Sequence, residues 1–398
     1  MKKRWWILAG TLGVYLLFSN SISDFLPKSQ DITQVKLVRA LAVDKGEEDG
    51  MLKLTSTGTV TPAGDGGESR PPLILKTDAQ TFLSGVTDLQ RQSQGYVEFG
   101  HLTQCVIGEE QATESVQGIL DFIERDYSMR LDTKLFLVLG ATGEELVDGA
   151  SSKYTDVTQR LEAIQEDEVL GGYWWSYNLR EIISHLEDNG SALIPALKLE
   201  DNPDYNKDQP DEAPKSNVKL TGLAFLKEYK LGGLLTEDES RGTALLIDQD
   251  QLDVLEFTME NGAVVGIQLV YARSKIEPVF DEMGKLTELH ITVRMKGDLN
   301  EIRGWADPMD EATLEEMEKS CQEELESLCR AALDRSWEEE TDFLHLRRRL
   351  ITQCPLEAVS IQQHWEEWFP DITCTVEAEG HIERTYDVDQ PMEENEGG

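Results

Sequence analysis

Basic residues are scarce in this 398-residue chain. Lys and Arg number 37 against 76 Asp and Glu, which gives a formal net charge of −39 at pH 7. Affinity for nucleic acids depends on clustered Lys and Arg that neutralise phosphates, so the composition excludes a general nucleic-acid binder. The same shortage argues against broad adhesion to an anionic membrane surface. The charged fraction of 28% is ordinary, so the imbalance is one of sign.

Long apolar runs are also scarce, because the sequence has one, at its amino terminus, and this excludes a multi-pass membrane protein. Basic residues at positions 2–4 precede an uncharged run from Trp5 to Ile22. This order predicts either an uncleaved membrane anchor or a signal peptide cut at the small residues 19–21, and both interpretations stay open. In either case the residues from about 24 onward lie outside the cytoplasm. The residues expected to form the anchor are Trp5, Trp6, Ile7, Leu8, Leu12, Val14, Tyr15, Leu16, Leu17 and Phe18.

Cysteine is used little and without a metal-binding pattern. There are five cysteines, an odd number with no CxxC pair, and their spacing fits no zinc site. Cys321 and Cys329 fall in a helical pattern that would separate them by about 12 Å along the axis. A disulfide needs Cα atoms within about 7 Å, so this pair is excluded and most of these thiols are expected in the core.

Sequence motifs for catalysis are missing. The chain has no Walker A loop, GxSxG or HExxH, and its glycines at 64–67 form no complete GxGxxG. The six histidines are scattered, and none pairs with another at metal-ligand spacing. The sequence therefore predicts no catalytic residues, no metal site and no cofactor.

What the chain does have is alternating strand and helix patterns. Period-two alternation predicts a β-hairpin over 35–60. After it the pattern predicts a strand over 96–107 that contains Gly100 and His101, one amphipathic helix over 109–126, and an apolar strand over 135–139. This order suggests an α/β layer with parallel strands. Further helices are expected over 79–90, 154–164 and 179–186.

The carboxy-terminal half reads as strands followed by helices. Strands are expected over 218–225 and 242–247, and a hairpin is expected around Asn261-Gly262. A long amphipathic helix is predicted over 310–334, with Met317, Cys321, Leu325, Leu328 and Ala332 on one face. Further helices over 343–353 and 358–369 precede a terminal hairpin that turns at Glu379-Gly380.

A composition shift suggests the domain boundaries. Residues 200–216 carry six acids and three prolines, which is typical of a linker or a long exposed loop. The predicted fold class is α/β (α+β), multi-domain, with mixed β-sheets packed with helices. The predicted order is an anchor or signal segment (1–23), an α/β domain (31–199), the acidic linker or loop (200–216), a β-rich domain (217–295), an α/β domain (296–386) and an acidic disordered tail (387–398).

Two aromatic clusters allow opposite interpretations. The stretch GYWWSY, which contains Trp174 and Trp175, could form a patch that binds a ligand or a partner, or it could pack under a loop. In HWEEWF the rings of Trp365, Trp368 and Phe369 recur at helical spacing, which favours a buried helix face.

Several segments together resemble the Ger(x)C family, the C subunits of GerA-type spore germinant receptors. The most specific is Gly100–Gly140, which carries elements similar to the family's GHL, IGEE, LDF, RD and MRLDT in order. The segments VKLVRALAVDKG, VKLTGLAFLKEYKLGGLLTEDESRG and WEEWFPDITCTVEAEGHI are also similar to family regions. The resemblance covers about residues 31–385. It makes Gly100, His101, Leu102, Arg130 and Asp132 candidate interaction residues, although Arg130 and Asp132 also fit a local ion pair.

The resemblance implies a non-enzymatic protein with three α/β domains at the outer face of the spore inner membrane. It implies assembly with integral membrane A- and B-type receptor subunits to support nutrient-triggered germination, and it names no particular germinant. Family members usually carry a lipobox cysteine after the apolar segment, and this sequence has none there, so the apolar helix itself is the expected tether. A cleaved segment would instead give a secreted protein.

Two other functions remain as alternatives from the residues alone. One is a membrane-anchored extracellular ligand-binding module that uses the GYWWSY patch. The other is a secreted hydrolase with an unrecognised acidic site.

Overall fold

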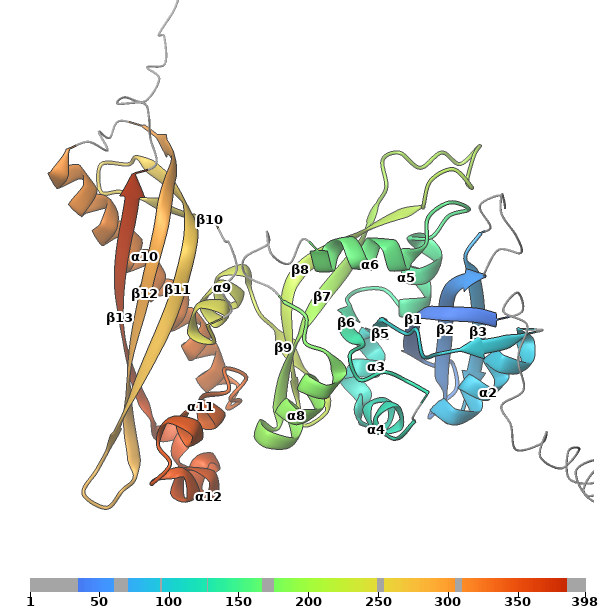
Figure 1. The fold of residues 1–398 in the computed structure, drawn as a ribbon, viewed down its shortest axis with the longest axis horizontal. Coiled ribbons are helices and arrows are strands. Elements are labelled where there is room, and N and C mark those ends of the chain that lie inside the picture. The colour runs from blue at the N-terminus through green and yellow to red at the C-terminus, as the bar shows by residue number, and fades with distance from the viewer. Residues whose placement is uncertain are drawn as a thin grey trace, which may run out of the picture.

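The computed structural model describes residues 35–60, 71–93, 95–126, 128–166, 175–248, 254–304 and 310–384. The predicted anchor, Trp174 and the acidic tail lie outside these described residues. Two β-sheets, each packed with helices, form the described part of the chain (Figure 1). This mixed architecture confirms the predicted fold class. Within the described ranges, no helix is both long and apolar enough to cross a membrane.

The first sheet has a parallel centre and antiparallel edges. Its strand order is β3-β2-β1-β5-β6-β7-β8-β9, with the short β4 also paired to β1. Strands β1, β5, β6 and β7 are parallel, which confirms the predicted parallel layer, and β1 and β2 form the predicted hairpin. The strands are β1 (Val35–Lys45), β2 (Leu52–Val60), β3 (Leu73–Ala79), β4 (Tyr96–Glu98), β5 (Gln104–Gly108), β6 (Lys134–Val138), β7 (Ser191–Asp201), β8 (Ser216–Lys227) and β9 (Lys230–Leu234).

Helices cover both faces of this sheet. One face packs against α2 (Phe82–Gln92), α3 (Glu109–Glu114), α4 (Gln117–Arg125) and α8 (Leu179–Asn189), and the other against α5 (Gly143–Gly149) and α6 (Val157–Glu166). Successive strand residues point to opposite faces, so Leu41 lies in the first core and Ala42 in the second. Capping boxes begin three of the helices, at Thr81, Thr142 and Asn178.

The second sheet packs one face against a long helix. It consists of β10 (Val254–Thr258), β11 (Val264–Phe280), β12 (Leu286–Arg303) and β13 (Thr373–Arg384), in that order. The helix α10 (Glu311–Glu338) buries Met317, Cys321, Leu325, Leu328 and Ala332, as its periodicity predicts. The remaining helices are α9 (Glu237–Leu246), α11 (Leu346–Gln353), α12 (Ala358–Trp368) and the 3₁₀ turn η2 (Phe369–Asp371). Trp365, Trp368 and Phe369 are buried, which confirms their predicted core role.

The two sheets share an apolar contact surface, which we call the seam. On one side it is formed by α8, β7 and β8, and on the other by residues 339–350. Phe225 of β8 stacks on Phe343 with ring centroids 5.1 Å apart. Leu193 and Leu223 of the first sheet belong to the same buried cluster as the core of the second. Burial of this apolar surface holds the two halves together.

Two predictions in the first half were wrong. The strand predicted over 96–107 is two strands, separated by a turn in which Leu102 N–H donates to the carbonyl of Phe99 at 2.9 Å. The helix predicted over 109–126 breaks at Ser115, whose backbone is extended. There Val116 N–H donates to the carbonyl of Tyr229 at 2.8 Å, so a tertiary hydrogen bond interrupts a continuous helical pattern.

Two more predictions were wrong in the second half. Residues 242–247 belong mostly to α9, because Thr236 and Glu239 form a capping box and three acids occupy the first turn. The predicted terminal hairpin is one strand, β13, which pairs in parallel with β12 from Thr373 to Arg384. Gly380 lies opposite Met295 in the middle of this strand and does not turn. The hairpin around Asn261-Gly262 is confirmed.

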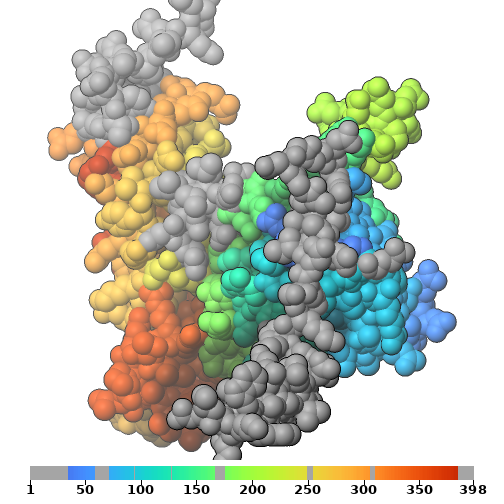
Figure 2. Space-filling view, turned by 45° about the vertical axis from the view of Figure 1, so that its right-hand side comes forward, coloured from blue at the N-terminus to red at the C-terminus, as the bar shows by residue number. Residues whose placement is uncertain are grey.

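The acidic segment 200–216 connects neighbouring strands of one sheet. Its ends belong to β7 and β8, which pair antiparallel from Ser191–Lys227 to Asp201–Ser216. The residues between them form a loop that projects from the surface (Figures 1 and 2). The first sheet therefore continues through the predicted boundary between 31–199 and 217–295, because β8 and β9 complete it.

Candidate functional site

The first family-motif segment forms the turn between β4 and β5. Gly100 N–H donates to Glu98 Oε1 at 2.9 Å, and a Cβ at Gly100 would lie 2.8 Å from that same oxygen. His101 is exposed, whereas Leu102 is fully buried. The turn therefore exposes the His101 side chain to solvent, and the buried side chain of Leu102 anchors the turn in the core.

The second motif segment lies beside the first, at the amino ends of the parallel strands β5 and β6. Thr133 Oγ1 lies 2.8 Å from the carbonyl oxygens of both Leu102 and Arg130. Arg130 Nε donates to Asp132 Oδ1 at 2.8 Å, and each side chain of this pair is 56% exposed. We call the set Gly100, His101, Leu102, Arg130 and Asp132 the motif edge. The structure thus brings together residues that the sequence separates by about thirty positions.

The charged groups of the motif edge are suited to binding a partner. The hydrogen bond from Arg130 lowers the pKa of Asp132 below its ordinary value, so this carboxylate stays ionised near neutral pH. A general acid or base needs a pKa close to the working pH, which Asp132 does not have. In the described ranges no three His, Cys, Asp or Glu side chains are placed to hold a metal ion.

Replacing Arg130 by alanine is expected to leave the stability of the protein nearly unchanged. Ion pairs between exposed side chains contribute little, because solvent screens them and ordering both side chains costs entropy. Thermal unfolding of the purified variant measures the change, with Asp132→Ala as the matched partner variant. A clear loss of stability in either variant would contradict this expectation, because it would show that the exposed pair supports the turn between α4 and β6.

Trp175 is not part of an exposed patch. Its side chain is 3% exposed, meets Tyr177 edge-on at 5.9 Å between centroids, and belongs to the buried cluster at the seam. This residue is therefore unavailable to a ligand at the surface, and the packing interpretation of GYWWSY is correct for it.

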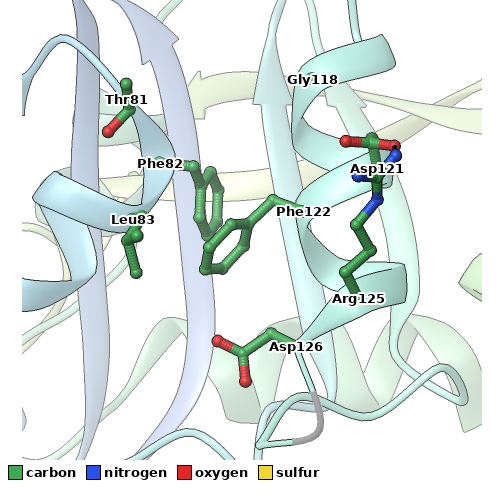
Figure 3. Close-up of a pocket in the computed structure, with 8 residues that line it drawn as sticks. All are labelled: Thr81, Phe82, Leu83, Gly118, Asp121, Phe122, Arg125 and Asp126. Atoms are coloured by element: carbon green, nitrogen blue, oxygen red, sulfur yellow. Dashed lines mark hydrogen bonds and ion pairs between the residues drawn. The ribbon is translucent and has the colours of Figure 1, made fainter.

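A surface groove lies between α2 and α4, where sequence reasoning placed no site. Its volume is about 430 Å³. Figure 3 shows the rings of Phe82 and Phe122 facing each other in it, with centroids 4.7 Å apart. Leu83 is 60% exposed, and the ion pair between Asp121 and Arg125 forms the rim on α4. An apolar floor with a charged rim is the usual composition of a protein contact surface.

A buried carboxylate explains two further motif positions. Asp44, at the end of β1, accepts hydrogen bonds from the N–H groups of Gly143 at 2.7 Å and Glu144 at 2.9 Å, where α5 begins. Burial raises the pKa of Asp44 above its ordinary value. A Cβ at Gly108, the glycine of the IGEE element, would lie 2.2 Å from Asp44 Oδ1. These positions are therefore constrained by packing.

All five cysteines are free thiols. Cys105, Cys321 and Cys329 are buried, and burial raises the pKa of each to about 12. They therefore stay protonated, and the predicted role of core thiols holds for these three.

The seam has a polar end that sequence spacing did not indicate. His185 of α8 lies against His345, which precedes α11, with ring centroids 4.1 Å apart. Asn189 Nδ2 lies 2.8 Å from His345 Nδ1, and Ser191 Oγ donates to the carbonyl of Asp342 at 2.8 Å. The carboxylate of Asp342 accepts from the N–H groups that begin α11.

The polar groups at this end of the seam are almost fully buried. Desolvation lowers the pKa of His185 to about 4 and lowers the pKa of His345 well below its ordinary value. Desolvation also raises the pKa of Asp342 to about 6, although the two backbone hydrogen bonds oppose that rise. Both histidines are therefore neutral at pH 7.

Comparison with known proteins finds similarity to spore germination proteins along nearly the whole chain. The family described as "Spore germination protein N-terminal domain" matches residues 28–199, and "Spore germination B3/ GerAC like, C-terminal" matches residues 221–386. YfkR of Bacillus subtilis (strain 168), named as a spore germination protein, is 20% identical over 354 residues, which are 86% of this chain and 88% of YfkR. The crystal structure of the GerBC protein matches with a TM-score of 0.55 and 21% identity, over 88% of this chain and 99% of that one. This last match shows a shared fold.

Proposed function

The chain belongs to the Ger(x)C family of spore germination proteins, the C subunits of germinant receptors, and from this premise we propose how it works. We propose that it is a non-enzymatic subunit, tethered by its amino-terminal apolar segment at the outer face of the spore inner membrane. There it assembles with integral membrane A- and B-type subunits and supports nutrient-triggered germination.

One observation carries the proposal. The amino-terminal and carboxy-terminal family domains match in series, over 28–199 and 221–386, so the chain has the complete order of a family member. The fold shared with GerBC supports it independently of any single motif. The exposed side chains of the motif edge (His101, Arg130 and Asp132) and the groove between α2 and α4 provide surfaces of the right chemistry for contacts with other subunits.

The tether follows from the sequence of residues 5–22. An uncharged run of this length after basic residues favours retention with the basic end inside. A transmembrane helix holds a protein more firmly than a single acyl chain, so the missing lipobox cysteine does not prevent anchoring. Mass spectrometry of the mature amino terminus tests this step, and a chain that begins near residue 22 in the soluble fraction would overturn it.

A clean deletion in the native host, without a paralogue, tests the whole proposal. The expected result is at least about a tenfold slower loss of optical density when spores meet their nutrient, with germination by a non-nutrient trigger unchanged. An affinity-tagged copy that restores germination should co-purify two multi-pass proteins from detergent extracts. Normal nutrient germination in the deletion strain would refute the proposed role.

A further inference from the structure

The polar end of the seam joins the two halves of the molecule through titratable groups. His185 belongs to the first half and His345 to the second, and their rings are in contact at 4.1 Å between centroids. The edge of Tyr177 meets His185 at 4.7 Å between centroids. His185 Nδ1 and His345 Nε2 are buried without a hydrogen-bond partner. A proton on either of these two nitrogens would therefore have no hydrogen-bond acceptor.

The backbone at this contact is strained. His345 has a φ of 55° and Glu340 a φ of 47°, a left-handed conformation that residues other than glycine rarely adopt. A hollow of about 140 Å³ lies beside the contact, lined by groups from both halves that include Asn189, Lys227 and Asp342. The seam is thus less tightly packed here than at the stacked rings of Phe225 and Phe343.

We propose that the contact between α8 and α11 is a pH-sensitive joint. It is closed while His185 and His345 are both neutral, and it loosens when mild acid protonates them. The apolar part of the seam around Phe225 and Phe343 stays in place, so the two halves gain freedom at one end without separating.

The direction of the effect follows from proton linkage. In the closed joint His185 has a pKa of about 4 and His345 a pKa well below 6.5, whereas a solvated histidine has about 6.5. The open joint therefore binds more protons as the pH falls below 6.5. At pH 5.5 His185 favours opening by about 10-fold, and His345 acts in the same direction.

Asp342 acts in the opposite direction. Its pKa is about 6 in the closed joint against 3.8 in solvent. Protonation of Asp342 therefore favours the closed joint by about 4-fold at pH 5.5. His185 alone outweighs Asp342 by about 2.5-fold and His345 adds to it, so the net expected effect between pH 7.5 and pH 5.5 favours opening by more than about 2-fold. The other charged groups that face the joint are Glu181 and Asp188 from α8, Lys227 and Glu228 at the end of β8, Glu340 ahead of α11, Arg347 and Arg348 from α11, and Glu366 from α12.

Arg348 works with the histidines. It forms a cross-seam ion pair with Asp188 at 3.6 Å, and its charge disfavours protonation of both rings. Glu181 and Asp188 favour protonation of His185, but desolvation outweighs them. The balance therefore keeps the rings neutral in the closed joint.

Hydrogen exchange of the full-length protein at pH 7.5 and pH 5.5, corrected for intrinsic exchange rates, tests the proposal. We expect the protection of amides in α8 and α11 to fall by more than about 2-fold, while amides of β12 keep theirs. The variant Asp342→Asn should show a larger fall, of at least about 10-fold, because the opposing group is gone. Unchanged protection of α8 and α11 in the wild type would overturn the proposal.

Variants without the histidines provide the control. In His185→Phe the aromatic contact is kept, and in His345→Asn a residue that tolerates the left-handed backbone replaces the ring. The double variant should reverse the pH response, because Asp342 then acts alone and raises protection by about 4-fold at pH 5.5, and His345→Asn alone should reduce the fall in protection. His364→Gln, at an exposed histidine of α12, should respond like the wild type. A double variant that responds like the wild type would assign the effect to other groups and refute the joint.

Discussion

Replacing Gly242 by alanine is expected to destabilise the protein by about 2–3 kcal/mol, although alanine is the better helix former. Gly242 lies inside α9 where this helix crosses α10, and a Cβ there would be 1.9 Å from the carbonyl oxygen of Leu328. That oxygen belongs to a helix backbone, which cannot move aside as a flexible side chain can. The helices must therefore separate, and overpacking against a rigid backbone lies at the upper end of the usual range, about 3 kcal/mol and occasionally more. The helix propensity of alanine returns about 1 kcal/mol of this.

A second helical glycine provides the matched control. Gly118, in α4, is exposed and has no atom within 4 Å of the position that a Cβ would take. Gly118→Ala should therefore stabilise the protein by about 0.5–1 kcal/mol. Urea or thermal unfolding of both variants measures the contrast in sign. If Gly242→Ala were as stable as Gly118→Ala, the close crossing of α9 and α10 would be wrong.

Replacing Arg349 by methionine should cost a similar amount, about 2–3 kcal/mol. The guanidinium of Arg349 in α11 donates to the carbonyl of Leu246 at 2.8 Å, to Ser274 Oγ at 2.6 Å and to the Ser274 carbonyl. It also pairs with Asp248 at 3.1 Å. Methionine keeps much of the apolar stem but removes these donors and the positive charge beside Asp248. Ser274 still donates to the Leu246 carbonyl and to Asp248, which limits the loss. Breaking a fully buried pair costs about 3–5 kcal/mol, and the 21% and 29% exposure of this pair reduces that figure.

The partner residue and an exposed arginine separate the causes. Adding Asp248→Asn to Arg349→Met should recover part of the loss, because the unpaired carboxylate is removed. Arg330→Met should cost less than about 1 kcal/mol, since Arg330 is 62% exposed and lies 3.7 Å from Glu326. Equal losses for Arg349→Met and Arg330→Met, measured by denaturant unfolding, would contradict the bridging role of Arg349.

Local patterns predicted most elements of this fold. The hairpin of β1 and β2, the parallel pairing of β5 with β6 and the buried face of α10 all follow from apolar periodicity, which depends only on neighbouring residues. The family resemblance pointed to the motif edge as well. It could not show that Thr133 joins the two motif segments, because that contact exists only after β5 and β6 pair.

Two of the errors arise where a distant partner outweighs a local signal. The helix predicted over 109–126 breaks where Val116 N–H donates to the carbonyl of Tyr229. The turn predicted at Glu379-Gly380 does not form, because these residues continue a strand that pairs with β12. Residues 242–247 contain an apolar run that suits a strand, yet the capping box at Thr236 begins a helix that Gly242 allows to pack on α10. Trp175 could be assigned to the core only once the seam was known.

By itself the sequence determined the acidic surface charge, the α/β class and the family, because composition, periodicity and ordered motifs are properties of the chain before it folds. Tertiary structure alone decided that His185 contacts His345 and that Asp44 accepts hydrogen bonds from the first N–H groups of α5. It also decided that Arg349 connects α11 to α9 and β11. Such contacts depend on residues far apart along the chain. Burial then sets the protonation of these groups, since desolvation is a property of the assembled core and not of any local pattern.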